Sequence, residues 1–132
     1  MKRILIIHCS DSPHDYHGVE AIKQWHTDPK PKGRGWTDIG YHWVIERSGD
    51  LKPGRSESRK GAHTLGHNDE IGICLCGLSG QFENDQMKTL ETFVLSRNTN
   101  ISEIRQHSDF ESKKPHCAGL TDSQMKYLNS LL

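Results

Sequence analysis

Apolar and polar positions form distinct patterns along the chain, and the first pattern is that of a buried strand. Branched residues run from Ile4 to Ile7 and are followed by a histidine and by the turn-forming residues SDSPHD. This order favours a short strand over Arg3 to His8 that ends at a turn. The strand therefore ends in His8, a side chain that fills strands poorly but binds metal ions well.

The next segments predict a helix and then a hairpin. Residues 19–28 carry apolar or aromatic side chains with the helical spacing of three, at Val19, Ile22 and Trp25. A Pro- and Gly-rich break follows at residues 28–35. Beyond it, four apolar or aromatic side chains alternate with others before a Ser-Gly-Asp turn: Ile39, Tyr41, Trp43 and Ile45. This alternation predicts a strand and hairpin.

The second half of the chain predicts two more strands and two more helices. The near-continuous apolar run IGICLCGL (71–78) is typical of a central strand covered on both faces. Residues 84–98 have helical spacing, and ISEIRQH (101–107) predicts a strand that, like the first, ends in a histidine. Thr121 and Gln124 occupy capping-box positions at the start of a closing helix.

These segments together predict one α/β domain over residues 1–132, with a central mixed β-sheet flanked by helices. A chain of 132 residues can bury a core without staples, so a metal would serve chemistry rather than scaffolding. The chain has 17 Lys and Arg against 17 Asp and Glu, which disfavours nucleic acid and anionic membranes as partners. A neutral polymer or a small substrate fits this charge balance better.

The cysteines and the N-terminus indicate where such a protein is made. Cys74 and Cys76 alternate within an apolar run, as two side chains on one strand face would, so we expect reduced thiols. The N-terminal apolar run is too short for a signal peptide, and no segment reaches the length of a transmembrane helix. We therefore expect a soluble monomer that is synthesised in the cytoplasm.

The candidate chemistry lies where the strands end. Two predicted strands end in histidine, His8 and His107, and Cys117 lies in the loop after the second of them. Two imidazoles and a thiolate can bind zinc and leave its fourth position open, as catalytic sites do. On spacing alone, ordinary hydrogen bonds to strand-end histidines are the commoner arrangement. His14 and His17, three residues apart in a turn segment, are expected to face solvent.

Five blocks of the sequence resemble a known family in order and nearly in spacing. They are IIHCSDSP, GVEAIKQWH, GWTDIGYHWVIERSGDLKPGR, GAHTLGHNDEIGICLCG and HSDFESKKPHC. They are similar to the zinc-dependent N-acetylmuramoyl-L-alanine amidases, most of all to short phage endolysins and more distantly to peptidoglycan recognition proteins. The resemblance implies an amidase fold and hydrolysis of the bond between N-acetylmuramic acid and L-alanine, in peptidoglycan or in a soluble muropeptide.

The resemblance also implies roles at the site. It makes His8, His107 and Cys117 the ligands of one Zn²⁺. It places Tyr41 beside them, where the hydroxyl would activate or orient the catalytic water. The ring of Tyr41 also suits a core position on an alternating strand, although its hydroxyl would still need a partner.

The GAHTLGHN block resembles the loop that borders the substrate groove in this family. His63, His67 and Asn68 thereby become candidate contacts to the peptide or sugar of the substrate. A histidine in a loop is also often no more than a local hydrogen-bonding residue. Both interpretations of these three residues are therefore kept.

The chain departs from the family at the residue that stabilises the oxyanion. The family commonly has a lysine two residues before its third ligand, where this chain has Pro115. The nearest lysine is Lys114, with Lys113 before it and His116 after the proline. Since proline favours an extended conformation at the residue before it, we predict that Lys114 reaches the reacting oxygen. Lys113 and His116 stay as alternatives.

Two other functions compete with catalysis. Family members that have lost the metal cysteine bind peptidoglycan without cutting it, but this chain keeps all three ligand positions. Some phage amidases also bind a polymerase, which nothing in this sequence tests. As an enzyme, the chain fits a phage or prophage endolysin that reaches the cell wall through a holin-type pore, or an intracellular enzyme that trims recycled wall fragments.

Overall fold

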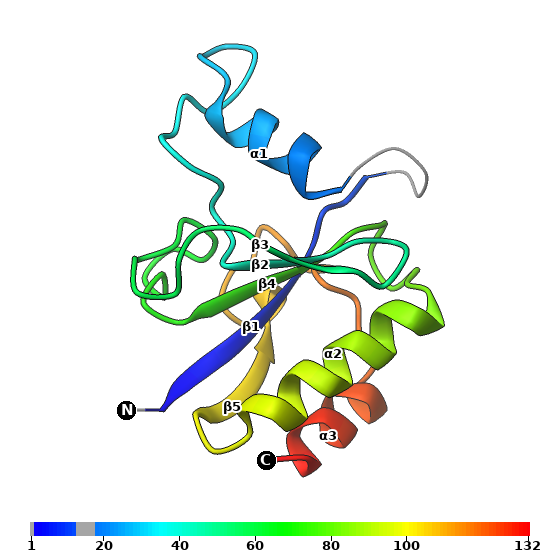
Figure 1. The fold of residues 1–132 in the computed structure, drawn as a ribbon. Coiled ribbons are helices and arrows are strands. Elements are labelled where there is room, and N and C mark those ends of the chain that lie inside the picture. The colour runs from blue at the N-terminus through cyan, green and yellow to red at the C-terminus, as the bar shows by residue number, and fades with distance from the viewer. Residues whose placement is uncertain (1, 13–17) are drawn as a thin grey trace.

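A five-stranded mixed sheet forms the centre of the computed structural model, which describes residues 2–12 and 18–132 (Figure 1). In chain order the strands are β1 (Arg3–Cys9), β2 (Trp43–Ile45), β3 (Leu51–Pro53), β4 (Ile71–Leu75) and β5 (Ile101–Gln106). Their spatial order is β3-β2-β4-β1-β5. β1 pairs in parallel with β4 and β5, β2 pairs in parallel with β4, and the β2–β3 pair is antiparallel. The predicted mixed sheet is confirmed.

Helices cover both faces of this sheet. They are α1 (Val19–Thr27), α2 (Asn84–Arg97) and α3 (Asp122–Ser130), together with a 3₁₀ turn, η1 (His107–Asp109). Figure 1 shows α2 and α3 side by side at one face and α1 at the other. Thr121 caps α3 in a capping box with Gln124, as the sequence predicts. Among the described residues, no helix has the length and apolar character that crossing a membrane requires.

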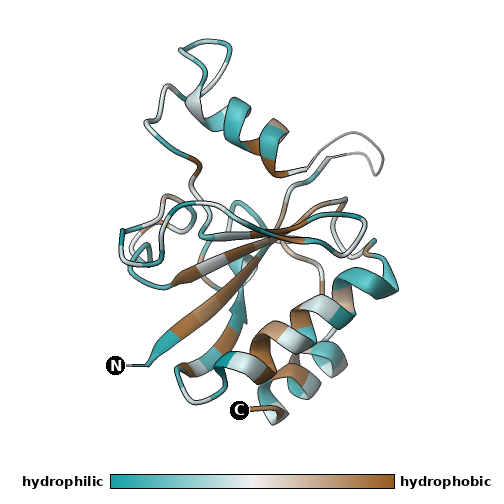
Figure 2. Cartoon of the chain, viewed as in Figure 1, coloured by the Kyte–Doolittle hydropathy of each residue, from teal (hydrophilic) through white to brown (hydrophobic). Residues whose placement is uncertain are grey.

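The apolar core is divided between the two faces. The larger part lies between the sheet and α2 and α3, and Figure 2 shows apolar residues concentrated on the central strands and on these two helices. The smaller part contains Ile22 of α1 with Val44, Cys74 and Cys76. Cys74 and Cys76 therefore share one side of the sheet as predicted, and both are free thiols.

Ile22 and His26 lie on the inward face of α1. Trp25, which has the helical spacing from Ile22, is 38% exposed, whereas His26 is 8% exposed. His26 lies four residues after Ile22, which brings it back over the same face of a 3.6-residue helix. Its Nδ1 also accepts a hydrogen bond from the backbone N–H of Gly40 at 2.9 Å, so the buried imidazole has a partner.

The strand predicted over residues 39–45 is regular only in its last three residues. Ile39 and Tyr41 pack towards α1, whereas Trp43 and Ile45 pack with the core on the side of α2 and α3. The four alternating residues therefore do not share one face. In the segment before β2, the carbonyls of residues 40–42 accept hydrogen bonds from amides of the chain that follows β3.

Candidate metal centre and active-site cavity

His8 lies on the face of the sheet that α1 covers. In the β1–β4 pair, His8 is in register with Cys74, whose side chain belongs to the core under α1. The side chain of His8 is 1% exposed. The sequence predicted a strand that ends at His8. In the structure β1 continues to Cys9, so His8 is the last residue but one of its strand. Its ring is buried against the sheet, and it is presented from the face of a central strand.

β5 and the loop after it bring the other two candidate ligands to His8. His107 begins the η1 turn directly after β5, and because β5 lies beside β1, the rings of His107 and His8 are 4.4 Å apart between centroids. The following loop returns to the end of β1, where the Sγ of Cys117 accepts a hydrogen bond from the Cys9 N–H at 3.2 Å. Ligand atoms of His8, His107 and Cys117 all lie within 4.8 Å of one another.

This donor set fits a zinc ion. Tetrahedral zinc with nitrogen and sulfur ligands holds its ligand atoms about 3.5 Å apart, so small side-chain adjustments would close the group. Burial, with His63 and His107 nearby, holds the pKa of His8 well below its ordinary value. Burial and the Lys114 ammonium lower the pKa of His107. Both imidazoles are thus neutral near pH 7, which is the form that binds metal.

The thiol of Cys117 would need a nearby cation to lose its proton near neutral pH. The side chain of Cys9 and burial raise the pKa of Cys117 above its ordinary value, although the Cys9 N–H acts in the opposite direction. A metal ion at the three donors would supply the positive charge that favours the thiolate. The site therefore combines two candidate ligands that are already in their neutral, metal-binding form with a third that would become a thiolate on metal binding.

A cavity of about 930 Å³ opens over this group. His107 and Cys117 line it together with Tyr41, His63 and Lys114. The side nearest α1 adds Trp25, Arg34 and Trp36, none of which was among the candidate site residues. The Arg34 guanidinium lies 5.0 Å above the ring of Trp36. Aromatic and basic residues at the end of α1 and in the segment after it were the only feature of the sequence from which this side of the cavity could have been predicted.

Tyr41 lies beside the candidate ligands. Its ring centroid is 5.0 Å from that of His8. Burial, followed by the nearby thiols of Cys74, Cys117 and Cys9, raises the pKa of Tyr41 well above its ordinary value. The hydroxyl therefore stays protonated near neutral pH. It lies within hydrogen-bonding reach of the Cys74 side chain, and Tyr41 also lines the cavity.

The loop before Cys117 places its three candidate oxyanion residues at the cavity rim. Lys113, Lys114 and His116 are all exposed, and all three line the cavity. Lys114 is close enough to His107 to lower the pKa of that ring. His116 is tied back through its carbonyl, which accepts a hydrogen bond from the Ser79 hydroxyl.

The structure separates the three predicted substrate contacts. His63 lines the cavity, with its Nδ1 3.0 Å from the Nε2 of His8. His67 stacks on Phe110, with ring centroids 4.2 Å apart, and neither His67 nor Asn68 is among the described residues that line the cavity. Contact of these residues with substrate stays a prediction. His14 and His17, expected to face solvent, lie outside the described residues.

Comparison with known proteins places this chain in a family. No family model matches it. Over 120 residues it is 34% identical to an endolysin of Enterobacteria phage T3, an alignment that covers 83% of this chain and 76% of that protein. The chain belongs to the amidase family of the phage endolysins. It is also 36% identical over 101 residues to an endolysin of Escherichia phage T7, covering 70% of this chain and 64% of that protein.

Solved structures of amidase-family proteins share the fold. The N-acetylmuramoyl-L-alanine amidase LysC from Clostridium intestinale aligns with 97% of this chain and 85% of its own, with a TM-score of 0.79 and 25% identity. Drosophila PGRP-LB aligns with 98% of this chain and 80% of its own, with a TM-score of 0.76 and 22% identity. The family resemblance and the fold expected from the sequence are thus confirmed.

Proposed function

We propose that this chain is a zinc-dependent N-acetylmuramoyl-L-alanine amidase, with residues 1–132 forming one catalytic domain. It hydrolyses the amide bond between N-acetylmuramic acid and the L-alanine of the stem peptide. The observation that carries this proposal is the group of His8, His107 and Cys117, with ligand atoms within 4.8 Å of one another beside a cavity. The phage T3 endolysin and the Clostridium amidase support the choice of reaction.

Each part of the chemistry has a residue in the cavity. When bound by His8, His107 and Cys117, zinc lowers the pKa of water to about 7 and polarises an amide carbonyl. The protonated hydroxyl of Tyr41 donates a hydrogen bond beside His8 and orients the attacking water or the carbonyl oxygen. The ammonium of Lys114 offsets the negative charge that grows on the carbonyl oxygen during attack. One preorganised donor of this kind typically lowers the activation free energy by about 3 kcal/mol.

The phage relatives support a biological setting for the enzyme. We place the enzyme among phage or prophage endolysins that act on the cell wall after passage through a holin-type pore, working as a monomer. Its formal net charge of zero suits a polymer that is not bound through bulk electrostatics. A soluble muropeptide is the other substrate that would fit the cavity.

The proposal is tested by digestion of two substrates. Purified enzyme loaded with zinc is incubated with intact peptidoglycan and, separately, with a soluble muropeptide, and the products are identified by mass spectrometry. Release of stem peptides with a free L-alanine amino terminus is expected. The relative rates identify the natural substrate. Binding to peptidoglycan without release of peptide would overturn the amidase assignment in favour of a binding module.

Metal removal gives an independent test. A chelator is expected to abolish release of peptide and to lower the melting temperature, because bound metal stabilises only the folded chain. The fully buried part of the larger core contains none of the three proposed ligands, although Cys117 packs against it, so we expect the chain to stay folded at room temperature. Circular dichroism with and without chelator checks this. Unfolding on chelation would mean that the metal is structural.

A further inference from the structure

The ring of His63 is tightly packed next to His8. Its side chain is 8% exposed. Gly72 of β4 passes so close that a Cβ there would lie 2.5 Å from His63 Cδ2, and a Cβ on Gly61 would lie at the same distance. Two glycines thus make room for the imidazole. Packing fixes the plane of the ring, and the polar groups around it decide which edge carries each nitrogen, because both nitrogens then have hydrogen-bond partners.

The two nitrogens of His63 have partners of different kinds. Nε2 lies 3.1 Å from the backbone carbonyl of Glu70. A carbonyl only accepts, so Nε2 carries the hydrogen of the neutral ring and Nδ1 is left as an acceptor. Nδ1 lies 3.0 Å from Nε2 of His8 and 2.9 Å from the hydroxyl of Thr64.

These contacts assign the hydrogen on His8. If its Nε2 carried no hydrogen, two acceptor nitrogens would face each other at 3.0 Å, and the hydroxyl of Thr64 could satisfy only one of them. Buried acceptors without a partner are strongly disfavoured. With the hydrogen on Nε2, His8 donates to His63 and both rings are satisfied. The lone pair of His8 then lies on Nδ1.

The loop that presents His63 is organised by its own sequence. The side-chain oxygen of Asn68 accepts hydrogen bonds from the N–H groups of His63 and Thr64, at 2.8 and 2.9 Å. The N–H of Gly61 donates to the carbonyl of Asn68 at 2.9 Å. The GAHTLGHN block therefore folds around Asn68 and holds His63 and Thr64 against His8.

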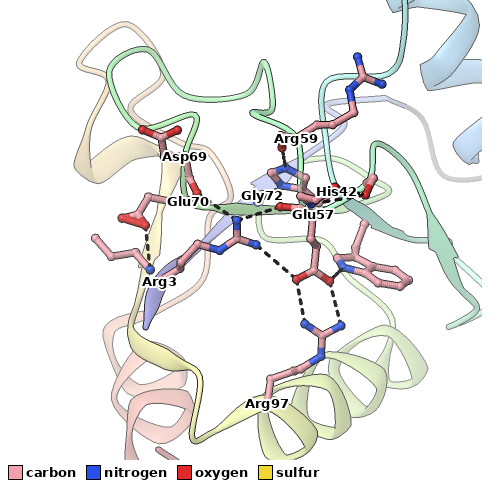
Figure 3. Close-up of polar contacts among 12 residues, drawn as sticks. Arg3, His42, Glu57, Arg59, Asp69, Glu70, Gly72 and Arg97 are labelled. Carbon is pink, nitrogen blue, oxygen red and sulfur yellow. Dashed lines mark hydrogen bonds and ion pairs between the residues drawn. The ribbon is translucent and has the colours of Figure 1, made fainter. Parts of the chain in front are cut away.

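An ion-pair network ties the end of this loop to β1, the strand that carries His8. Arg3 donates to the backbone carbonyls of Glu57 and Asp69 (Figure 3). The carboxylate of Glu57 accepts two hydrogen bonds from the guanidinium of Arg97, at 2.9 and 2.8 Å. Such bidentate pairs fix geometry as well as adding energy. Strand and loop are thus joined at two points, at Arg3 and at His8.

We propose that His63 is a positioning residue for the metal ligand His8. Its Nδ1 accepts the Nε2 hydrogen of His8, fixes that tautomer and leaves Nδ1 of His8 as the donor atom to the metal. Partners of this kind hold ligating histidines in place, and their loss typically weakens metal binding by about 10- to 100-fold. The inference rests on the zinc site of the proposed function and assigns His63 a role towards the protein's own ligand.

The first experiment needs no metal. Two-bond ¹H–¹⁵N correlation spectra of the metal-free protein, labelled at histidine nitrogens, distinguish the two neutral tautomers. His8 is identified by the signals that disappear in His8→Gln. The Nε2–H form is expected for His8. The Nδ1–H form would overturn the proposal.

The second experiment measures zinc affinity by competition with a chromogenic chelator. His63→Leu is expected to raise the Kd for zinc by about 10- to 100-fold, whereas His63→Asn, whose side-chain oxygen can replace Nδ1 as the acceptor, stays within about threefold of the wild type. His67→Leu is the matched control, since it makes the same change in the same loop without touching His8. Melting curves of the metal-free variants confirm that each one is folded.

The outcomes separate this inference from the proposed function. If the wild type binds no zinc, the proposed function fails. If the wild type binds zinc and His63→Leu binds it equally well, the positioning role fails while the zinc site stands. If His63→Asn is as weak as His63→Leu, the hydrogen bond is not what matters, and the proposal is again overturned.

Discussion

The two walls that meet at the candidate metal centre are built differently. The buried wall consists of His8, His63 and Thr64, which are 1%, 8% and 2% exposed and which bond to one another. The open wall is the loop of residues 110–117, where the residues of the SKKPH segment are all exposed. In the proposed site, the buried wall would fix the orientation of the candidate ligand His8, whereas the open wall presents the lysine side chains to the cavity. His107 and Cys117 join the two.

The largest effect is expected from breaking the buried wall at its ligand. His8→Ala removes one of three donors, so zinc and all measurable release of peptide should be lost. Metal content per chain, measured on purified protein by mass spectrometry, checks this. His67→Ala is the control and should keep its zinc. One zinc per chain in His8→Ala would show that this histidine is not a ligand.

Removing the hydroxyl of Tyr41 is expected to lower turnover nearly as much as the loss of a ligand. Tyr41→Phe keeps the packed ring and the zinc but loses the hydrogen-bond donor, and we expect turnover to fall by roughly 10²- to 10³-fold. Initial rates on a soluble muropeptide, with zinc content measured in parallel, test this. A rate near that of the wild type would leave Tyr41 as a packing residue only.

A somewhat smaller effect is expected from the open wall. Lys114→Ala should lower turnover about a hundredfold with zinc retained, because a charge that stabilises the oxyanion is lost. Lys113→Ala and His116→Ala are the comparisons, and both should change turnover little. If His116→Ala proves to be the damaging change, the oxyanion role belongs to that imidazole instead of the lysine.

The smallest effect concerns a buried imidazole outside both walls. Burial lowers the pKa of His26 to about 4 in the folded chain, against about 6.5 when unfolded. The unfolded chain therefore binds more protons between these values, so the free energy of unfolding falls as pH drops from 6.5 towards 4 and is unaffected above 6.5.

Melting curves of the metal-free protein at pH 7 and pH 5 test this contribution. In His26→Asn, which keeps an acceptor for the Gly40 N–H, the melting temperature should fall less between the two values than in the wild type. His116→Asn changes an exposed histidine and should behave like the wild type. An equal fall in all three proteins would show that His26 does not contribute.

Regular periodicity made most of the fold predictable. The apolar runs from Ile4 to Ile7 and from Ile71 onwards predicted buried strands, and the spacing of apolar side chains predicted the helices. The sequence placed His8 and His107 at strand ends, but that the two strands are neighbours is known only from the structure, and the grouping of the two histidines came from the family resemblance. Pairing of Cys117 with these histidines came from family resemblance, since a loop ten residues long leaves many positions open.

What the sequence left unpredicted depends on contacts between distant segments. Tyr41 and Trp43 pack against different parts of the core although they alternate in sequence, and local alternation does not record this change of face. The inward turn of His26 depends on the N–H of Gly40. The contact of His63 with His8 joins residues 55 positions apart, and a GAH motif alone gives no sign of which side chain it will meet.

Gly72 has a consequence for engineering this protein. Replacing a glycine inside a strand with alanine is a common route to higher stability, because alanine reduces the freedom of the unfolded chain. At position 72 the added methyl would lie 2.5 Å from the ring of His63, and either the ring or the strand would have to move. A stabilisation campaign guided by secondary structure alone would therefore select a position where one carbon atom disturbs the support of His8.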